Sequence, residues 1–254
     1  MDGSQLLSVS PLDSTRFGIK VVRGTLPAGT PHTAITAALE STQADLAIVR
    51  TEAGDCAAMV QLQRAGWPLI HADTLLYYGI DLGTVAPAPS ALPVRLATAG
   101  DRAAIAHIAE RSFDGYRAHY AANPLLPPAL ILAGYIEWAN SRLGTDDPGA
   151  CTWVICQDDG VAGFATCDID AGRGLVDIVL NAVHPDHARQ GLYGQLLKAI
   201  LGHYASVGMR RLTVSTQVWN VAVQRRWTWA GLRLERAMDT YHIDRRLAQP
   251  KAAA

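Results

Sequence analysis

The chain has 254 residues, of which 49% are hydrophobic and 18% are charged. This apolar content supplies a buried core and excludes a wholly disordered chain. The 22 Lys and Arg residues against 23 Asp and Glu residues give a net charge of -1. That balance argues against a general nucleic-acid or anionic-membrane surface. At about 150 residues per domain, the length fits one or two domains.

The four cysteines indicate neither a metal site nor a disulfide framework. None stands in a CxxC pair, and no His/Cys cluster has zinc spacing, so no metal is expected. Their low density fits a reducing cytoplasm, which is the expected location. The first residues lack the basic and apolar parts of a secretory signal, and no run of about 20 apolar residues predicts a membrane span.

The clearest boundary in the sequence is residues 84–93, which contain Pro87, Pro89 and Pro93 among small residues. Such a composition favours an extended linker. We therefore predict a smaller domain over residues 1–83 and a larger one over residues 94–246. The alanine-rich residues 247–254 are expected to form a flexible tail.

Hydrophobic spacing predicts the elements of each region in chain order. The first region reads as mixed α/β: its expected strands are 19–23, 46–50 and 69–82, and its expected helices are 31–41 and 55–65. The second region has expected strands at 94–97, 152–157, 162–169, 174–183, 211–216 and 237–243. Its expected helices are 101–111, 130–143, 194–207 and 221–230, and residues 158–160 read as a hairpin turn. The predicted fold class is therefore α/β with a mixed sheet.

The loop after the strand 174–183 is the most informative segment. The strand ends at Val183, and a loop containing Arg189 and Gly191 opens directly into a helix. Unpaired backbone N–H groups and the helix dipole favour a pyrophosphate at such a place. Neither GxxxxGK[ST] nor GxGxxG is present, so the common nucleotide-binding loops are excluded. Taken alone, the segment is equally well an ordinary turn.

The downstream segment adds to this motif. The strand 211–216 is followed by Asn220, a helix over 221–230, and then Gly231 and Leu232. With Val183, Pro185 and Gly191, these residues resemble the GNAT superfamily of N-acetyltransferases. Its members show a V-x-P-x-x-[QR]-x-x-G-x-[GA] loop and, about thirty residues later, an N-x-x-A-x-x-x-Y-x-x-x-G-[FL] helix. The resemblance covers residues 94–243.

This resemblance implies a GNAT fold for the second region and an acyl-CoA-dependent acyltransferase activity. Acetyl-CoA, or another acyl-CoA, is the implied cosubstrate, and no metal is required. The residues implied to bind it are Ala182, Val183, Arg189, Gln190, Gly191, Leu192, Tyr193, Gly194, Asn220 and Trp227.

At the catalytic groups the sequence departs from the family pattern. Trp227 stands where the family usually has a tyrosine that protonates the departing thiolate, and an indole N–H is no useful proton donor. Water, another tyrosine such as Tyr193, or no positioned acid are the alternatives. Asp177 and His184 are candidates for deprotonating the attacking amine, although His184 could equally cap a turn.

The first region carries a second resemblance. Residues 11–18, 64–67, 74–75, 112–113, 119–120 and 123–124 look like the TDP-fucosamine acetyltransferase family, in which a truncated GNAT-like half precedes the catalytic half. The implied acceptor is an amine on a nucleotide-linked sugar. Other GNAT acceptors remain open, namely an amino acid, a polyamine, an antibiotic or a protein. So does a catalytically silent acyl-CoA-binding module. A homodimer is plausible because a sheet edge needs covering.

Overall fold

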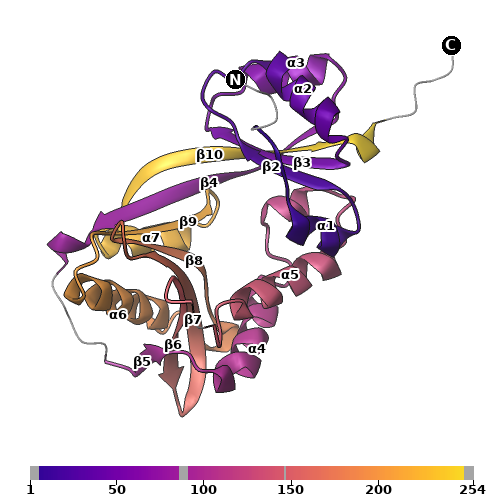
Figure 1. Cartoon of the computed structure of the whole chain (residues 1–254). Helices are drawn as coiled ribbons and strands as arrows, with labels where there is room; N and C mark the ends of the chain where they lie inside the picture. Colours follow the sequence, from indigo (N-terminus) through magenta and orange to yellow (C-terminus); the bar gives the residue numbers. More distant parts are fainter. Residues whose placement is uncertain (1–5, 86–90, 146, 249–254) are drawn as a thin grey trace. The chain divides into compact units, whose positions relative to one another are not determined.

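The computed structural model describes residues 6–85, 91–145 and 147–248, and these form two compact units (Figure 1). Unit 1 takes the residues up to Leu75, Arg117–Ile131, and those from Arg236 onward. Unit 2 takes Leu76–Tyr116 and Leu132–Glu235. The division therefore does not fall at the expected linker 84–93, of which residues 86–90 lie outside the described part.

Unit 1 contains strands β1 (Ser8–Val9), β2 (Val21–Thr25) and β3 (Leu46–Glu52), together with one end each of β4 (Leu69–Asp81) and β10 (Arg233–Asp244). β2 and β3 are parallel, whereas β1 with β2 and β10 with β3 are antiparallel. β10 pairs with β3 from Met238 opposite Glu52 to Asp244 opposite Leu46. This long-range pairing explains why the last strand belongs to the unit built mainly from the first 75 residues. The helices of this unit are α1 (Pro11–Phe17), α2 (His32–Thr42) and α3 (Ala57–Arg64).

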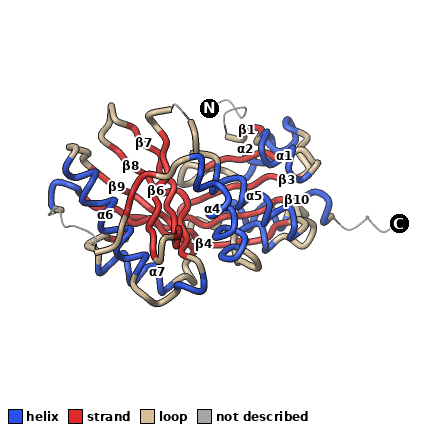
Figure 2. The backbone as a smooth tube through the Cα atoms, turned by 90° about the horizontal axis from the view of Figure 1, so that it is seen from below, coloured by secondary structure: helices blue, strands red, loops and turns tan. Residues whose placement is uncertain are grey.

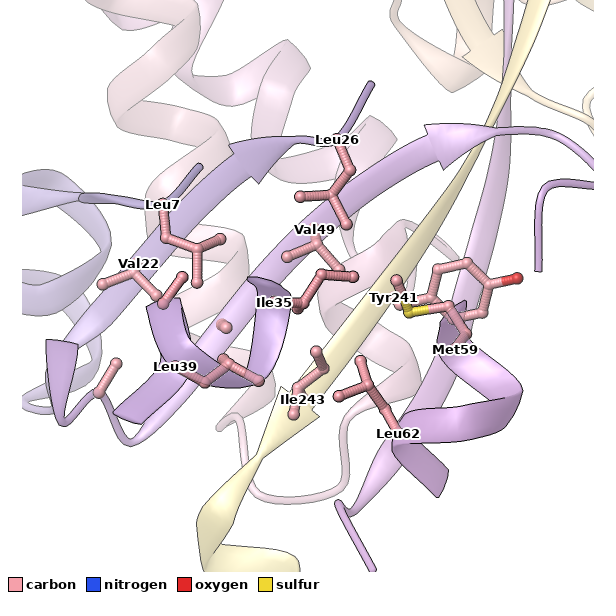
Figure 3. Packing of buried hydrophobic residues seen from close by; sticks show 13 residues of the cluster. Leu7, Val22, Leu26, Ile35, Leu39, Val49, Met59, Leu62, Tyr241 and Ile243 are labelled. Atoms are coloured by element: carbon pink, nitrogen blue, oxygen red, sulfur yellow. The ribbon is translucent and has the colours of Figure 1, made fainter. Parts of the chain in front are cut away.

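The core of unit 1 lies under α2 and α3 (Figure 3). Because strand side chains alternate between faces, Tyr241 and Ile243 of β10 point to the same side of the strand. They pack with Val49 of β3 and with Ile35 and Leu39 of α2. At about 25 cal/mol per Å² of buried apolar surface, such side chains contribute about 1.5–3 kcal/mol each.

Unit 2 contains β5 (Val94–Leu96), β6 (Ala150–Gln157), β7 (Gly160–Asp170), β8 (Leu175–Val183) and β9 (Arg211–Gln217). β5 to β8 pair antiparallel in that order, and β9 then lies parallel to β8. The helices are α4 (Arg102–Phe113), α6 (Leu192–Ser206) and α7 (Val221–Trp229), while α5 (Pro128–Asn140) begins in unit 1. Both units also contain short 3-10 helices. Those of unit 2 are Leu82–Thr84, Ala99–Asp101 and Pro185–His187, and those of unit 1 are His119–Ala122 and Arg245–Leu247.

Helices cover both faces of the strands of unit 2 (Figure 1; Figure 2). On one face, Tyr204 of α6 accepts a hydrogen bond from Trp153 of β6. On the other, Tyr116, which follows α4, donates to Gln217 of β9. Thus α6 and α7 lie on one side of β8 and β9, and α4 lies on the opposite side.

The mixed α/β class and most of the expected elements are confirmed. The hairpin turn is confirmed too, because Asp158 and Asp159 both adopt left-handed φ values of 51° and 63°. Hydrophobic spacing did not predict β1 and α1, which are too short to show a periodic pattern. No helix among the described residues is long and apolar enough to cross a membrane.

Candidate acyl-CoA site

The site begins where the parallel strands β8 and β9 separate. The two strands pair from Leu175 opposite Arg211 to Ile178 opposite Val214. Beyond those positions β8 continues to Val183 and β9 to Gln217. The backbone groups of β8 that face β9 after Ile178 are therefore left without a strand partner on that side, and we call the separated ends of the two strands the slot.

An irregularity in β8 explains the separation. Thr166 of β7 pairs with Leu180, whereas the next residue, Cys167, pairs with Ile178, so Val179 is an extra residue in β8. Such a bulge bends the strand that carries it and increases its twist. It lies directly after the last pair with β9, so the bend turns the end of β8 away from its neighbour.

The loop from β8 to α6 has the geometry that a diphosphate needs. Arg189 and Gly191 have φ values of 64° and 80°, in the left-handed region that glycine adopts without strain. Gly191 is the N-cap of α6, and nothing lies within 4 Å of where its Cβ would stand. The first N–H groups of a helix have no intrahelical acceptor, so those of residues 191–194 are available to an anion. Gln190 is exposed and accepts a hydrogen bond from Gln157.

A groove of about 590 Å³ runs from this helix terminus along α6 toward α7. Gly194 has no Cβ, which allows the guanidinium of Arg226 on α7 to lie close against α6. The Arg226 guanidinium also lies 5.2 Å from the ring centre of Trp229, which is 74% exposed. The lining residues are Ile80, Thr84, Val85, Gly191, Gly194, Gln195, Lys198, Leu201, Arg226, Trp229, Ala230 and Gly231.

Among the predicted site residues, Trp227 and Tyr193 are joined by a side-chain hydrogen bond. Trp227 is fully buried, and its indole N–H donates to the Tyr193 hydroxyl oxygen at 2.6 Å. Its burial removes Trp227 from direct contact with a ligand in this conformation. Burial also raises the pKa of Tyr193, so this hydroxyl keeps its proton at neutral pH. Among the described residues, no acceptor for that proton is present.

Asp177 lies next to the point where the strands part. It is exposed, and the Thr213 hydroxyl of β9 donates to its carboxylate at 2.8 Å. These two residues are opposite each other, one position before the last β8–β9 pair. Ile178 shares a sheet face with Cys167 and Cys151, and Cys151 contacts Tyr204 of α6. Side chains alternate along a strand, so Asp177 stands on the face away from α6.

His184 forms part of the turn after β8. Its Nδ1 accepts from the backbone N–H of Asp186 at 3.3 Å, and its ring stacks on that of His107. The imidazole thus caps the 3-10 helix Pro185–His187, which was the alternative considered for it. Among the described residues, no group of His, Cys, Asp and Glu side chains could hold a metal ion.

The other predicted ligand-binding residues are placed at the same end of unit 2. Ala182 and Val183 form the end of β8, and the Val183 carbonyl accepts from Ser112 of α4. Asn220 precedes α7, and its amide donates to Thr216 of β9. Leu192 is 2% exposed, so its side chain packs in the core and only its backbone is available.

Sequence reasoning missed the groove between α6 and α7. From the sequence alone, Arg226 is either part of a solvated helix face or a contact to a CoA phosphate, and nothing links Lys198 or Trp229 to the loop. A helical-face count does place Gly191, Gly194, Lys198 and Leu201 along one side of α6, but nothing local indicates that α7 faces that side. The packing of α6 beside α7 is established only when the chain folds.

Several solved structures share the fold of this chain. A GCN5-related N-acetyltransferase from Sphaerobacter thermophilus superposes with a TM-score of 0.63 at 16% identity, covering 98% of this chain and 78% of that one. A GCN5-related N-acetyltransferase from Kribbella flavida gives 0.57 at 14% identity, covering 89% and 81%. A tandem GNAT protein from the clavulanic acid biosynthesis pathway, solved without AcCoA, gives 0.55 at 14% identity, covering 91% and 76%.

At these identities the structural likeness establishes the fold. No curated protein is similar to the chain at a significant level. The model of the acetyltransferase (GNAT) family matches residues 105–231, which is half of the chain and contains the loop, the slot and both helices of the groove. This chain therefore belongs to the acetyltransferase (GNAT) family.

Proposed function

We propose that the protein is an acyl-CoA-dependent N-acyltransferase, which moves an acetyl group from acetyl-CoA to the amino group of a small molecule. The observation that carries the proposal is the slot between β8 and β9, together with the loop that leads from the end of β8 to the N-terminus of α6. A thioester with a long, thin arm and a charged diphosphate needs both features at once. The slot accepts the arm, and the helix terminus accepts the charge.

The cosubstrate is held mainly by backbone groups and by three cationic side chains. The N–H groups of residues 191–194 bind the diphosphate, and Arg189 adds a charge at the loop. The groove then takes the nucleotide end, where Arg226 and Lys198 face phosphate and Trp229 offers a ring for stacking. Asn220 hydrogen-bonds along the arm, and the backbone N–H groups near Ala182 and Val183 polarise the thioester carbonyl.

Deprotonation of the amine falls to Asp177 rather than His184. The Asp177 carboxylate is exposed at the mouth of the slot, and the Thr213 hydroxyl fixes its direction. His184 already uses its Nδ1 to cap a turn. A carboxylate has a low intrinsic pKa, so Asp177 accepts the proton through a water molecule or after the substrate has covered it.

Protonation of the departing thiolate falls to Tyr193. Its hydroxyl oxygen is held by Trp227, while its proton points to no acceptor within the described protein. Trp227 acts as a positioning residue, because an indole cannot serve as the acid itself. The usual family tyrosine is thereby replaced by a tyrosine on α6 and a tryptophan on α7.

The acceptor is proposed to be an amine on a nucleotide-linked sugar. The support is the sequence resemblance at residues 11–18, 64–67, 74–75, 112–113, 119–120 and 123–124. The protein is further proposed to act in the cytoplasm and to form a homodimer. An amino acid, a polyamine, an antibiotic or a protein amine is the alternative acceptor. Trp227 at the usual tyrosine position also favours a second candidate, a silent module that binds acyl-CoA without turning it over.

The test combines calorimetry with a turnover assay. Titration of acetyl-CoA into the full chain is expected to give saturable heat, and a thiol-reactive dye is expected to report free CoA when a nucleotide-linked amino sugar is added. Binding without release of thiol for any amine of a panel supports the silent module. Absence of binding to acetyl-CoA and to longer acyl-CoA thioesters refutes both candidates.

A further inference from the structure

Two cysteines of unit 2 face each other across a strand pair that the acyl-transfer mechanism does not use. Cys151 of β6 lies directly opposite Cys167 of β7, and both are free thiols. Opposed residues of antiparallel strands have Cα atoms about 4.5–5.5 Å apart, inside the range of about 4.4–6.8 Å that a disulfide bridges. Their side chains also leave the strands on the same face, which is the arrangement that a cross-strand disulfide requires.

We propose that Cys151 and Cys167 form a reversible oxidation site, at which a hydroperoxide joins the two thiols into a cross-strand disulfide. The proposal does not rest on acyl transfer, because it uses neither the slot nor the groove.

The surroundings of the two thiols differ, which gives each a separate role. The Cys151 sulfur lies 3.2 Å from the Tyr204 hydroxyl of α6, and Tyr204 in turn accepts from Trp153. A hydrogen bond from Cys167, followed by one from Tyr204, lowers the pKa of Cys151 to about 7 despite its partial burial. The hydrogen bond with Cys151, and then burial, raise the pKa of Cys167. Cys151 is therefore the nucleophile and Cys167 the resolving thiol.

The chemistry balances with one peroxide molecule. The Cys151 thiolate attacks one peroxide oxygen, so an S–O bond forms, the O–O bond breaks, and the hydroxide that leaves takes a proton to become water. Cys151 is then a sulfenic acid. The Cys167 sulfur gives up its proton and attacks the Cys151 sulfur, so the S–S bond forms, the S–O bond breaks, and a second water leaves. The two thiols are oxidised and the peroxide is reduced.

Accessibility supports this order of events. Cys167 is 0% exposed, so peroxide reaches it only through its partner. Cys151 is partly exposed, and no third cysteine stands at a paired position beside it. Cys156 shares strand β6 with Cys151 but lies five residues along it, and Cys56 is exposed in unit 1. These two residues offer matched controls within the same chain.

The experiment treats the intact, folded chain with stoichiometric hydrogen peroxide near neutral pH, then alkylates it with N-ethylmaleimide in denaturant. Mass spectrometry is expected to show the loss of two hydrogens, two cysteines protected from alkylation, and a peptide that links Cys151 to Cys167. Dithiothreitol is expected to restore all four free thiols. Cys156→Ser and Cys56→Ser are expected to keep the cross-link.

Two further variants distinguish the roles of the sulfurs. Cys167→Ala is expected to stop at a sulfenic acid on residue 151 that dimedone labels, whereas Cys151→Ser is expected to give neither label nor cross-link. Circular dichroism checks that both variants are folded. Four alkylated cysteines after peroxide, a cross-link that involves Cys156 or Cys56, or over-oxidation of Cys151 without a disulfide overturns the proposal. Each of these results is independent of whether the protein turns over acetyl-CoA.

Discussion

The indole nitrogen of Trp227 lies 2.6 Å from the hydroxyl oxygen of Tyr193, and this hydrogen bond joins α7 to α6. Tyr78 of β4 packs edge-on against the Trp227 ring, with centroids 5.3 Å apart, and so fixes the direction of the indole. The Tyr193 hydroxyl oxygen accepts this hydrogen bond from the indole, so the hydroxyl proton of Tyr193 points away from Trp227.

Replacement of Tyr193 by Phe is expected to lower kcat by about 10²–10⁴-fold, the usual contribution of a positioned acid. KM for acetyl-CoA is expected to change little, because the lost hydroxyl acts on the departing thiolate. Steady-state kinetics with the thiol-reactive dye measure both values. A kcat equal to that of the unmodified chain assigns the proton to water instead.

Substitutions of Trp227 test positioning separately from proton donation. Trp227→Phe removes the N–H that holds Tyr193 and is expected to lower kcat by about tenfold, near the roughly 1.5 kcal/mol of one lost hydrogen bond. Trp227→Tyr supplies the hydroxyl that the family usually has at this position, and activity is expected to be equal or raised. If Trp227 had a purely structural role, its substitution would lower thermal stability and leave the pH profile of kcat unchanged. The thermal stability and the pH profile of each variant are therefore measured.

Gly191 tests the diphosphate cradle. An Asp at this position places a negative charge within a few Å of a phosphate, which costs about 1–4 kcal/mol and lowers affinity for CoA by about 10- to 10³-fold. Gly191→Asn is the matched control, because Asn tolerates the left-handed φ and adds no charge. Calorimetry compares the two. Equal affinity of the Asp and Asn variants places the diphosphate elsewhere.

Arg226 and its neighbour Arg225 form a natural pair for testing the groove. Arg226 lines the groove, whereas Arg225 is exposed and does not. Arg226→Ala is expected to weaken CoA binding by about 10- to 100-fold, because a charge-assisted hydrogen bond contributes about 1.5–3 kcal/mol. Its affinity is also expected to depend less on salt. Arg225→Ala is expected to bind like the unmodified chain, and a loss of similar size there would point to a general charge effect.

A buried histidine pair in unit 1 predicts a pH-dependent stability. His119 Nδ1 lies 2.9 Å from His242 Nε2, and the Nδ1 of His242 is buried with no hydrogen-bond partner. Burial, and then the charge of Arg23, lower the pKa of His242 from 6.5 to about 4. Burial also lowers the pKa of His119, with a further contribution from His242. Both rings are therefore neutral in the folded chain at pH 7.

The sign of the effect follows from these lowered values. The unfolded chain binds protons on these rings near pH 6.5, whereas the folded chain resists them, so their contribution is complete above pH 6.5 and is lost as pH falls toward 4. Urea unfolding is expected to show a loss of about 1–3 kcal/mol over this interval. His242→Gln is expected to flatten the dependence, and the exposed His203→Gln to leave it unchanged. An equally steep loss in His242→Gln assigns the dependence to other groups.

Features that depend only on residues close together along the chain could be predicted from the sequence. The Asp158–Gly160 turn, the glycine at the start of α6 and the periodic helices follow from backbone conformation and hydrophobic spacing over a few residues. The order of the loop and the Asn220 helix was enough to identify the family. These are local because each depends on the φ/ψ preferences and side-chain period of one short segment.

Which distant segments meet could not be predicted from the sequence, because it depends on packing across the folded chain. The pairing of β10 with β3, the bulge at Val179 and the approach of Arg226 to Gly194 join residues far apart in the chain. The role of Trp227 also changed: the sequence placed it at the cofactor, whereas packing buries it behind Tyr193. Such contacts depend on the burial of whole strand and helix faces against one another. The free energy of this burial comes from several segments together, so the residues of one segment do not reveal it.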